Sequence, residues 1–344
     1  MTKLFLLFWA LAISALASPD QPPANPGANP AARAVLKYIQ GLSARPDRRL
    51  LSGQFAEHTT GASGSSAVFN RIQQRTGVCP AIMGVDYANW GDGSIACAAA
   101  NPAAIRQWQH GGLVAIEVHC GNPCRTNFTA SGLRDQNVDV TPLFDLQSPA
   151  HGVWMRQLDQ MAAGLQELRA AGVVVLWRPF HEMNGSWFWW GGKKPAVTIE
   201  LWRQMFDYFS TEKHLDNLLW IYAPNHGDHT GDYYPGDRYV DLVGVDAYTD
   251  FVDTDHIKGT AEVLALPKPF GFAEFGPHDP FNPPGDYDYL RFINGAKDHF
   301  PQLAWFMAWN GNWGLTTNKN VTGLLHDPWI VNRSDLPQWS SPNH

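Results

Sequence analysis

The chain has 344 residues, a formal net charge of −7, and 15 Trp and 10 Tyr. This length allows one large domain or two ordinary ones. Lys and Arg form no basic run, and nucleic acids and anionic membranes are bound through clustered positive charge, so neither is expected as a partner. Trp is seldom needed in such number to fill a core, and aromatic faces suit sugars. The composition therefore favours a carbohydrate ligand.

The N-terminus has the pattern of a secretory signal peptide over residues 1–17. Lys3 precedes an apolar run from Leu4 to Leu16, and Ala15-Leu16-Ala17 matches a small-x-small cleavage site. The run is short for a membrane span, and polar residues follow at Ser18, so we expect cleavage after Ala17 rather than an anchor. The predicted protein is exported, extracellular or periplasmic, with no membrane partner.

Export would place the four cysteines in an oxidising compartment. We expect two local disulfides, Cys79–Cys97 and Cys120–Cys124, although the sequence leaves the connectivity open. The segment Cys-Gly-Asn-Pro-Cys could also suggest a metal site, but no second cysteine pair lies at zinc spacing. Neither a metal nor another cofactor is predicted.

The rest of the chain reads as a leader followed by a single domain. Residues 18–30 are rich in Pro and Asn and hold no aromatic residue, which predicts an extended leader outside the fold. Residues 31–340 show no break in composition. The helical spacing of apolar residues over 31–42 predicts the first helix of this domain.

Short apolar runs rich in β-branched residues recur along the domain, bounded by Gly, Pro or Asn. Helix-like segments lie between several of them, at 154–171, 198–209 and 287–300. This alternation predicts an α/β fold, the (β/α)8 or TIM barrel. An open doubly wound sheet is the alternative, but no Gly-rich dinucleotide turn follows the first run. The eight predicted strands are 50–55, 81–87, 113–119, 173–180, 218–223, 242–248, 270–275 and 303–309.

Polar residues collect at the ends of these predicted strands. Active sites of the barrel lie at the C-terminal ends of its strands, and five of the eight runs end in candidate site residues. These residues are Glu117 and His119, His181 and Glu182, Asp246 and Tyr248, Glu274, and Trp309 and Asn310.

Glu182 and Glu274 are the candidate catalytic pair. They lie 92 residues apart, at the ends of the fourth and seventh runs, which a barrel brings to one rim. Retaining glycoside hydrolysis needs two carboxyl groups about 5 to 5.5 Å apart. Aromatic residues after Glu182 would favour its protonated form, whereas Tyr248 and Arg178 could hold Glu274 ionised.

These residues carry a resemblance to a known family. The segment Trp177–Gly191, WRPFHEMNGSWFWWG, resembles the acid/base signature of glycoside hydrolase family 26, which is best represented by β-1,4-mannanases, and Gly271–Gly276, GFAEFG, is similar to its nucleophile strand. The resemblance extends over roughly residues 50–314. It implies a retaining barrel glycosidase with Glu182 as acid/base and Glu274 as nucleophile. His181 stands where most families of the same clan have Asn.

The resemblance also implies substrate-binding residues. His119 matches a substrate-contacting histidine, Trp187 the aromatic beyond the acid/base, Tyr248 the tyrosine that hydrogen-bonds the nucleophile, and Trp309 a sugar platform at subsite −1. We expect Trp189 and Trp190 to pack at the rim, and Asn225–His229 to form a solvated turn rather than a metal site.

The sequence therefore predicts a secreted, monomeric endo-β-1,4-mannanase that cleaves mannan, galactomannan or glucomannan with retention of configuration. Three alternatives remain open. The same fold and mechanism could act on β-1,3-xylan or mixed-linkage β-glucan, since fold does not fix the sugar. The enzyme could be exo-acting and release mannobiose. The chain could also be a non-catalytic carbohydrate-binding protein, against which the presence of both carboxylates argues.

Overall fold

The computed structural model describes residues 21–56, 62–89, 92–125, 130–278 and 283–339. The predicted signal peptide and its cleavage site lie outside these residues. Of the helices in the described ranges, none combines the length and apolar character needed to cross a membrane.

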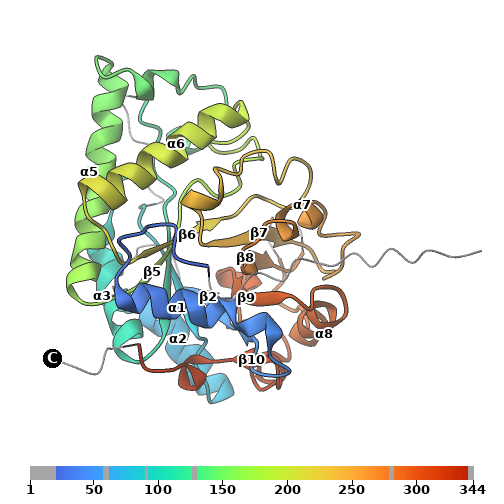
Figure 1. Cartoon of the computed structure of the whole chain (residues 1–344). Coiled ribbons are helices and arrows are strands. Elements are labelled where there is room, and N and C mark those ends of the chain that lie inside the picture. Colours follow the sequence, from blue (N-terminus) through green and yellow to red (C-terminus); the bar gives the residue numbers. More distant parts are fainter. Residues whose placement is uncertain (1–20, 57–61, 90–91, 126–129, 279–282, 340–344) are drawn as a thin grey trace, which may run out of the picture.

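Parallel strands close into a barrel (Figure 1), as predicted. Strand β2 pairs with β3, pairing then continues strand by strand to β8, and β9 joins β8 to β2. The first barrel strand is split into β1 and β2, and the two-residue β10, too short to give a sequence signal, pairs with β1. The strands are β1 (Leu50–Leu51), β2 (Gly53–Phe55), β3 (Ile82–Asp86), β4 (Leu113–Glu117), β5 (Val175–Arg178), β6 (Leu218–Tyr222), β7 (Leu242–Tyr248), β8 (Phe270–Gly276), β9 (Leu303–Ala308) and β10 (Ile330–Val331).

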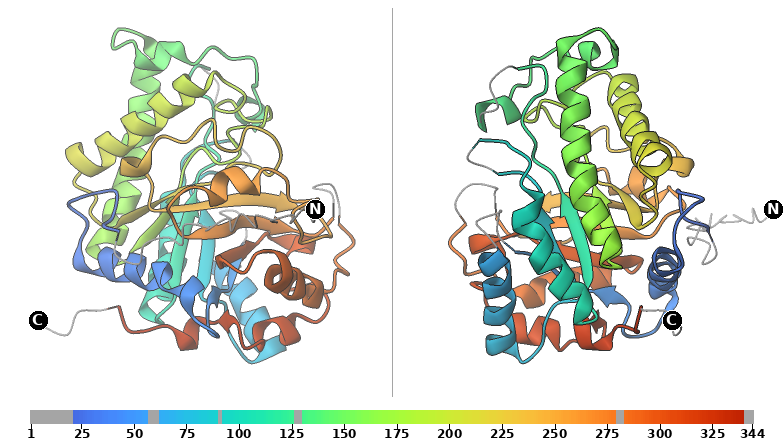
Figure 2. Two further views of the ribbon diagram at one scale, coloured as in Figure 1. Left: turned by 45° about the vertical axis from the view of Figure 1, so that its right-hand side comes forward. Right: turned by 90° about the vertical axis from the view of Figure 1, so that its left-hand side faces the viewer.

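Helices cover the outside of the barrel, and α3 and α5 lie side by side in Figure 2. Side chains cap the starts of α1, α5 and α8: Asn29 accepts from Ala32 N, Ser148 from Ala150 N and Asp288 from Leu290 N. The helices are α1 (Pro30–Gln40), α2 (Ala62–Thr76), α3 (Cys97–Gln109), α4 (Ala130–Leu133), α5 (Pro149–Ala170), α6 (Pro195–Asp207), α7 (Thr260–Leu264), α8 (Tyr289–His299) and α9 (Val321–Leu325).

Successive strand residues face two different apolar layers. In β5, Val175 and Trp177 belong to the large layer between strands and helices, whereas Leu176 belongs to the barrel interior. The same period of two carries Arg178 inward above Leu176. Polar residues at the inward-facing ends of strands therefore converge on one site.

The N-terminal segment differs from the prediction. Residues 21–29 pack against the barrel instead of lying outside it: Ala24 N donates to Asp241 Oδ1 (2.7 Å), the buried Asn25 donates to Leu215 O (3.0 Å), and Asn29 N donates to Asp216 O (2.8 Å). Helix α1 then places its apolar face against the barrel interior. Composition did not reveal this docking because it depends on hydrogen bonds rather than on apolar residues.

The predicted disulfides are not formed, and all four cysteines are free. Cys79 precedes β3 and Cys97 follows it, at the start of α3. The two cysteines therefore lie toward opposite ends of β3, a strand of five residues. At about 3.3 Å per residue, this strand separates their Cα atoms by more than the roughly 4.4 to 6.8 Å that a disulfide needs. Cys97 Sγ instead contacts Gln160 O at 3.7 Å. Cys120 and Cys124, although close in sequence, are also unpaired.

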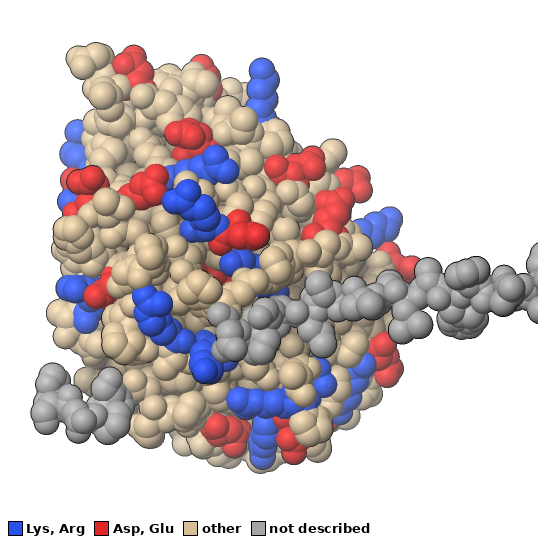
Figure 3. Space-filling view, viewed as in Figure 1, with Lys and Arg blue, Asp and Glu red and all other residues tan. Residues whose placement is uncertain are grey.

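Charges of both signs are mixed on the face shown in Figure 3. Lys and Arg alternate there with Asp and Glu, and no large area of positive charge gathers on this face.

Candidate active site

A cavity of about 620 Å³ opens at the C-terminal ends of the barrel strands. All seven residues predicted as site residues contribute to it: His119, His181, Glu182, Trp187, Tyr248, Glu274 and Trp309. The structure thus brings together residues that the sequence spreads over 190 positions. Its wall also includes Arg134, Phe188, Asn225, His226, Asn310 and Trp313.

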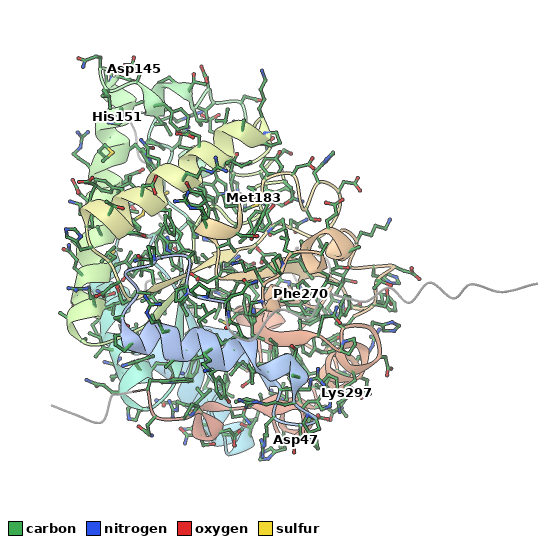
Figure 4. All side chains as sticks on the ribbon, viewed as in Figure 1. Asp47, Asp145, His151, Met183, Phe270 and Lys297 are labelled. Atoms are coloured by element: carbon green, nitrogen blue, oxygen red, sulfur yellow. The ribbon has the colours of Figure 1, made fainter. Side chains whose placement is uncertain are left out.

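A strained turn after β5 presents Glu182 to this cavity. Phe180 and Glu182 both have positive φ, 50° and 54°, a left-handed conformation that costs non-glycine residues energy and that clusters at functional sites. Glu182 N donates to Ala223 O (2.8 Å), which ties the turn to the end of β6. Figure 4 marks this turn with Met183, the next residue, and the start of β8 with Phe270.

Glu182 and Glu274 lie face to face across the cavity. One carboxylate oxygen from each, together with one from Asp246, lie within 4.8 Å of one another. Inverting glycosidases separate their carboxyl groups by about 6.5 to 9.5 Å, whereas retaining enzymes hold them about 5 to 5.5 Å apart. The observed spacing fits the retaining geometry.

Glu274 is held by two donors. Tyr248 donates from Oη to Glu274 Oε2 (2.5 Å), and the guanidinium of Arg178 contacts Oε1. The strand pairing around these residues is irregular. The register shifts at Val245/Asp246 in β7 and at Phe272/Phe275 in β8, where β8 pairs with β9. Such irregularities re-aim side chains at barrel rims. Charge-assisted hydrogen bonds of this kind favour an ionised carboxylate.

Arg178 is the central cation of the site. Its guanidinium is buried and contacts three acidic residues: Asp246, at 2.8 Å from Nη1, Glu274 and Glu117. Although burial opposes its charge, the neighbouring carboxylates raise the pKa of Arg178 above its usual value. Burial in turn raises the pKa of Asp246 well above its usual value. One cation thus organises several acids that would otherwise repel one another.

Glu182 has the electrostatic character of an acid. Burial and the negative charge of Glu274 raise its pKa to about 7, opposed by the Trp187 indole N–H, which donates to Glu182 Oε2. A pKa near neutrality allows the same group to give up a proton and later to take one back. The raised pKa lies at Glu182, the residue predicted from the sequence to be the acid.

His119 and His181 form a hydrogen-bonded pair beside Glu182. Their Nε2 atoms lie 2.8 Å apart, and His119 Nδ1 lies 2.7 Å from Asp86 Oδ2. Burial and the nearby Arg178 lower the pKa of His181 well below its usual value, so this ring stays neutral.

The aromatic residues near the site fall into two groups. Trp187 is half-buried in the cavity wall, and Trp309 is 8% exposed and lies against Phe55. Trp189 and Trp190 are buried outside the cavity and donate their indole N–H groups to Cys120 O and His181 O. They brace the turns on either side of the site.

Several site residues were missed from the sequence. Asp86 ends β3 and could have been found by the strand-end rule applied to the second run. The prediction of a solvated turn over Asn225–His229 fits His229, which is exposed and pairs with Asp232, but not Asn225 and His226, which line the cavity. Trp313 follows β9 in a three-residue 3-10 helix (Gly311–Trp313), which is too short to give a periodic signal.

Among the described residues, two groups of side chains have ligand atoms close enough together to suggest a metal site: Glu117, His119 and His181, and Glu182, Asp246 and Glu274. An internal cation already occupies the space between these acids, because Glu117, Asp246 and Glu274 all contact Arg178. The residues present therefore fit an acid/base site organised by a guanidinium.

A closed parallel barrel with one carboxylate just after its fourth strand and another on its seventh has the architecture of the (β/α)8 glycoside hydrolases. A model of glycosyl hydrolase family 26 matches residues 24–335. The chain belongs to this family.

Curated relatives and solved structures agree with this assignment. The chain is 34% identical over 354 residues to a mannan endo-1,4-beta-mannosidase of Bacillus subtilis (strain 168), covering 96% of this chain and 94% of the relative. It is 36% identical over 335 residues to mannan endo-1,4-beta-mannosidase A and B of Caldalkalibacillus mannanilyticus, covering 91% of this chain but only 62% of that longer protein. A solved mannanase from Bacillus subtilis superposes with a TM-score of 0.83 at 34% identity, over 91% of this chain and 95% of that one.

Proposed function

We propose that the chain is an endo-β-1,4-mannanase that hydrolyses mannan backbones with retention of configuration. The observation that carries the proposal is the spacing of Glu182 and Glu274, whose carboxylate oxygens lie within 4.8 Å of one another. This distance leaves no room for the water that an inverting enzyme activates between substrate and base.

Glu182 and Glu274 would act together in the first step. Glu182 gives its proton to the glycosidic oxygen as the bond from that oxygen to the anomeric carbon breaks. Glu274, which Tyr248 and Arg178 contact, attacks the same carbon as a carboxylate and forms a covalent glycosyl-enzyme, and the shortened chain leaves with the proton.

Glu182 then changes role. It is now a carboxylate, and it removes a proton from a water molecule that attacks the anomeric carbon. The bond to Glu274 breaks, the sugar leaves with a new hydroxyl, and both carboxyl groups return to their starting states. The pKa of about 7 at Glu182 suits both directions of proton transfer.

The substrate follows from the relatives and the cavity wall. The curated relatives are named as enzymes that cut within β-1,4-mannan, and the half-buried indole of Trp187 offers a face on which a pyranose ring can pack. Because Trp187 contacts the acid Glu182, it stands on the side where the leaving group departs.

Export is part of the proposal. It rests on the apolar run and small-residue cleavage pattern before Ser18, and it suits an enzyme whose polymer substrate cannot enter a cell. N-terminal sequencing of the protein recovered from culture medium would give Ser18 as the first residue.

Activity on a panel of purified polysaccharides tests the function. We expect reducing sugar to be released from β-1,4-mannan, and little from β-1,3-xylan or mixed-linkage β-glucan, with mannohexaose cut internally into several products. Glu274→Ala should lose this activity while keeping its fold. Preferred cleavage of another polysaccharide, or full activity in the Glu274→Ala variant, would overturn the proposal.

A further inference from the structure

Asp86 is a buried acid at the site to which the mechanism above gives no role. It is 2% exposed and does not line the cavity. Its carboxylate accepts from Ala88 N at 2.8 Å and His119 N at 3.2 Å, and Oδ2 lies 2.7 Å from His119 Nδ1. An anion in this position requires the proton of a neutral His119 ring to lie on Nδ1.

The other nitrogen of His119 meets His181. Their Nε2 atoms lie 2.8 Å apart, and such a contact is a hydrogen bond only when one of the two nitrogens carries a proton and the other does not. Two protonation patterns satisfy this requirement. In the first, a neutral His119 accepts from His181 Nε2–H; in the second, His119 is an imidazolium that donates to His181.

The environment of His181 Nδ1 distinguishes the two patterns. This nitrogen is buried and has no hydrogen-bond partner among the described residues. In the second pattern a neutral His181 carries its proton on Nδ1, which leaves a buried N–H without an acceptor. In the first pattern Nδ1 is a bare acceptor, and unpaired buried acceptors are better tolerated than unpaired donors.

We propose that Asp86 is a positioning residue that, through His119, fixes the protonation pattern of the histidine pair. Asp86 holds the proton on His119 Nδ1, which keeps His119 Nε2 as an acceptor and places a proton on His181 Nε2. Both histidines line the cavity, and their Nε2 atoms are bonded to each other, so this pattern fixes the orientation of two rings in the wall beside Glu182.

This inference rests on the proposed function only for the substrate of its kinetic test, because the protonation pattern does not depend on which sugar binds. Nitrogen-15 NMR of the histidine rings tests the pattern in the wild-type protein without any substrate. Loss of its signals in His119→Gln assigns His119. We expect a proton on Nδ1 and none on Nε2 at neutral pH. A proton on His119 Nε2, in either the neutral or the charged ring, would overturn the proposal.

A double-mutant cycle tests whether Asp86 acts through His119. Asp86→Asn keeps the size of the side chain and removes its charge; we expect kcat/KM on mannohexaose to fall by about 10- to 100-fold, as when other histidines lose a carboxylate partner. His119→Gln should cost at least as much. If Asp86 works through His119, adding Asp86→Asn to His119→Gln should change kcat/KM by less than about twofold. Fully additive losses would contradict the proposal.

Asp241→Asn is the matched control for removing a buried carboxylate. Asp241 is 1% exposed and also accepts backbone N–H groups, from Ala24 and Trp220, but it lies at the start of β7, away from the cavity. We expect kcat/KM to stay near the wild-type value in this variant. If the wild type does not hydrolyse mannan, the proposed function fails, and the NMR measurement still decides the protonation pattern.

Discussion

Glu182 connects the geometry of single residues to the pH dependence of the enzyme. Its carboxyl group must be protonated to start the reaction, and burial together with Glu274 raises its pKa to about 7. We expect the rate of hydrolysis of a soluble manno-oligosaccharide to fall as the pH rises through this value. An alkaline limb centred near the ordinary pKa of glutamate would contradict the assignment.

Trp187 adjusts this titration. Its indole N–H donates to Glu182 and stabilises the ionised form, so it lowers the pKa that burial raises. Trp187→Phe should move the alkaline limb of kcat/KM to higher pH, because the carboxylate loses its donor. Trp108→Phe on α3 makes the same change away from the cavity and should leave the profile in place. An unchanged profile in Trp187→Phe would show that the hydrogen bond does not set this pKa.

Glu182 also links activity to stability. Its folded pKa of about 7 lies above the ordinary value of 4.5, so the unfolded chain loses this proton first and the fold loses stability as the pH rises from about 4.5 to 7. Glu182→Gln removes the titrating carboxyl group, so this variant does not lose stability over that pH range. We expect its melting temperature to exceed the wild-type value at pH 8 by more than at pH 4, and the exposed Glu200→Gln to show no such difference. An equal effect at both pH values would contradict a raised pKa.

At the scale of elements, two helical glycines provide a matched test of packing. A Cβ at Gly295 in α8 would lie 2.5 Å from Val252 O, whereas at Gly152 in α5 the nearest atom, at 3.6 Å, is the flexible end of Arg156. Gly295→Ala should reduce the free energy of unfolding by about 1 to 3 kcal/mol. Gly152→Ala should raise it by about 0.5 to 1 kcal/mol. Urea unfolding of both variants measures the difference, and equal effects would show that the contact of α8 with Val252 is not tight.

The elements were largely predictable from sequence because barrel strands are buried on both faces and read as short apolar runs. Their C-terminal ends also located Glu182 and Glu274. The turn that presents Glu182 was not predictable, since its positive φ values at Phe180 and Glu182 contradict local preference. Nor was the docking of residues 21–29, which depends on hydrogen bonds to distant carbonyl and carboxylate groups such as Asp241. Both features are set by tertiary contacts that leave no periodic pattern.

At the scale of the whole molecule, the fold is held without covalent cross-links between its four cysteines. We expect a thiol assay in denaturant to find four free thiols per chain, and a reducing agent to leave the melting temperature unchanged. Two thiols would indicate that one disulfide forms, and none that both do. We predicted disulfides because export implies an oxidising compartment. The number of residues between Cys79 and Cys97 does not reveal that a β-strand lies between them and keeps them apart.

The central claim is that Glu182 and Glu274 hydrolyse β-1,4-mannosidic bonds with retention. Proton NMR during the first minutes of mannohexaose hydrolysis observes the configuration at the new reducing end directly, before mutarotation mixes the two anomers. The spacing of the two carboxylates, within 4.8 Å of each other, predicts that the β-anomer appears first and the α-anomer only later. Initial release of the α-anomer would contradict the account.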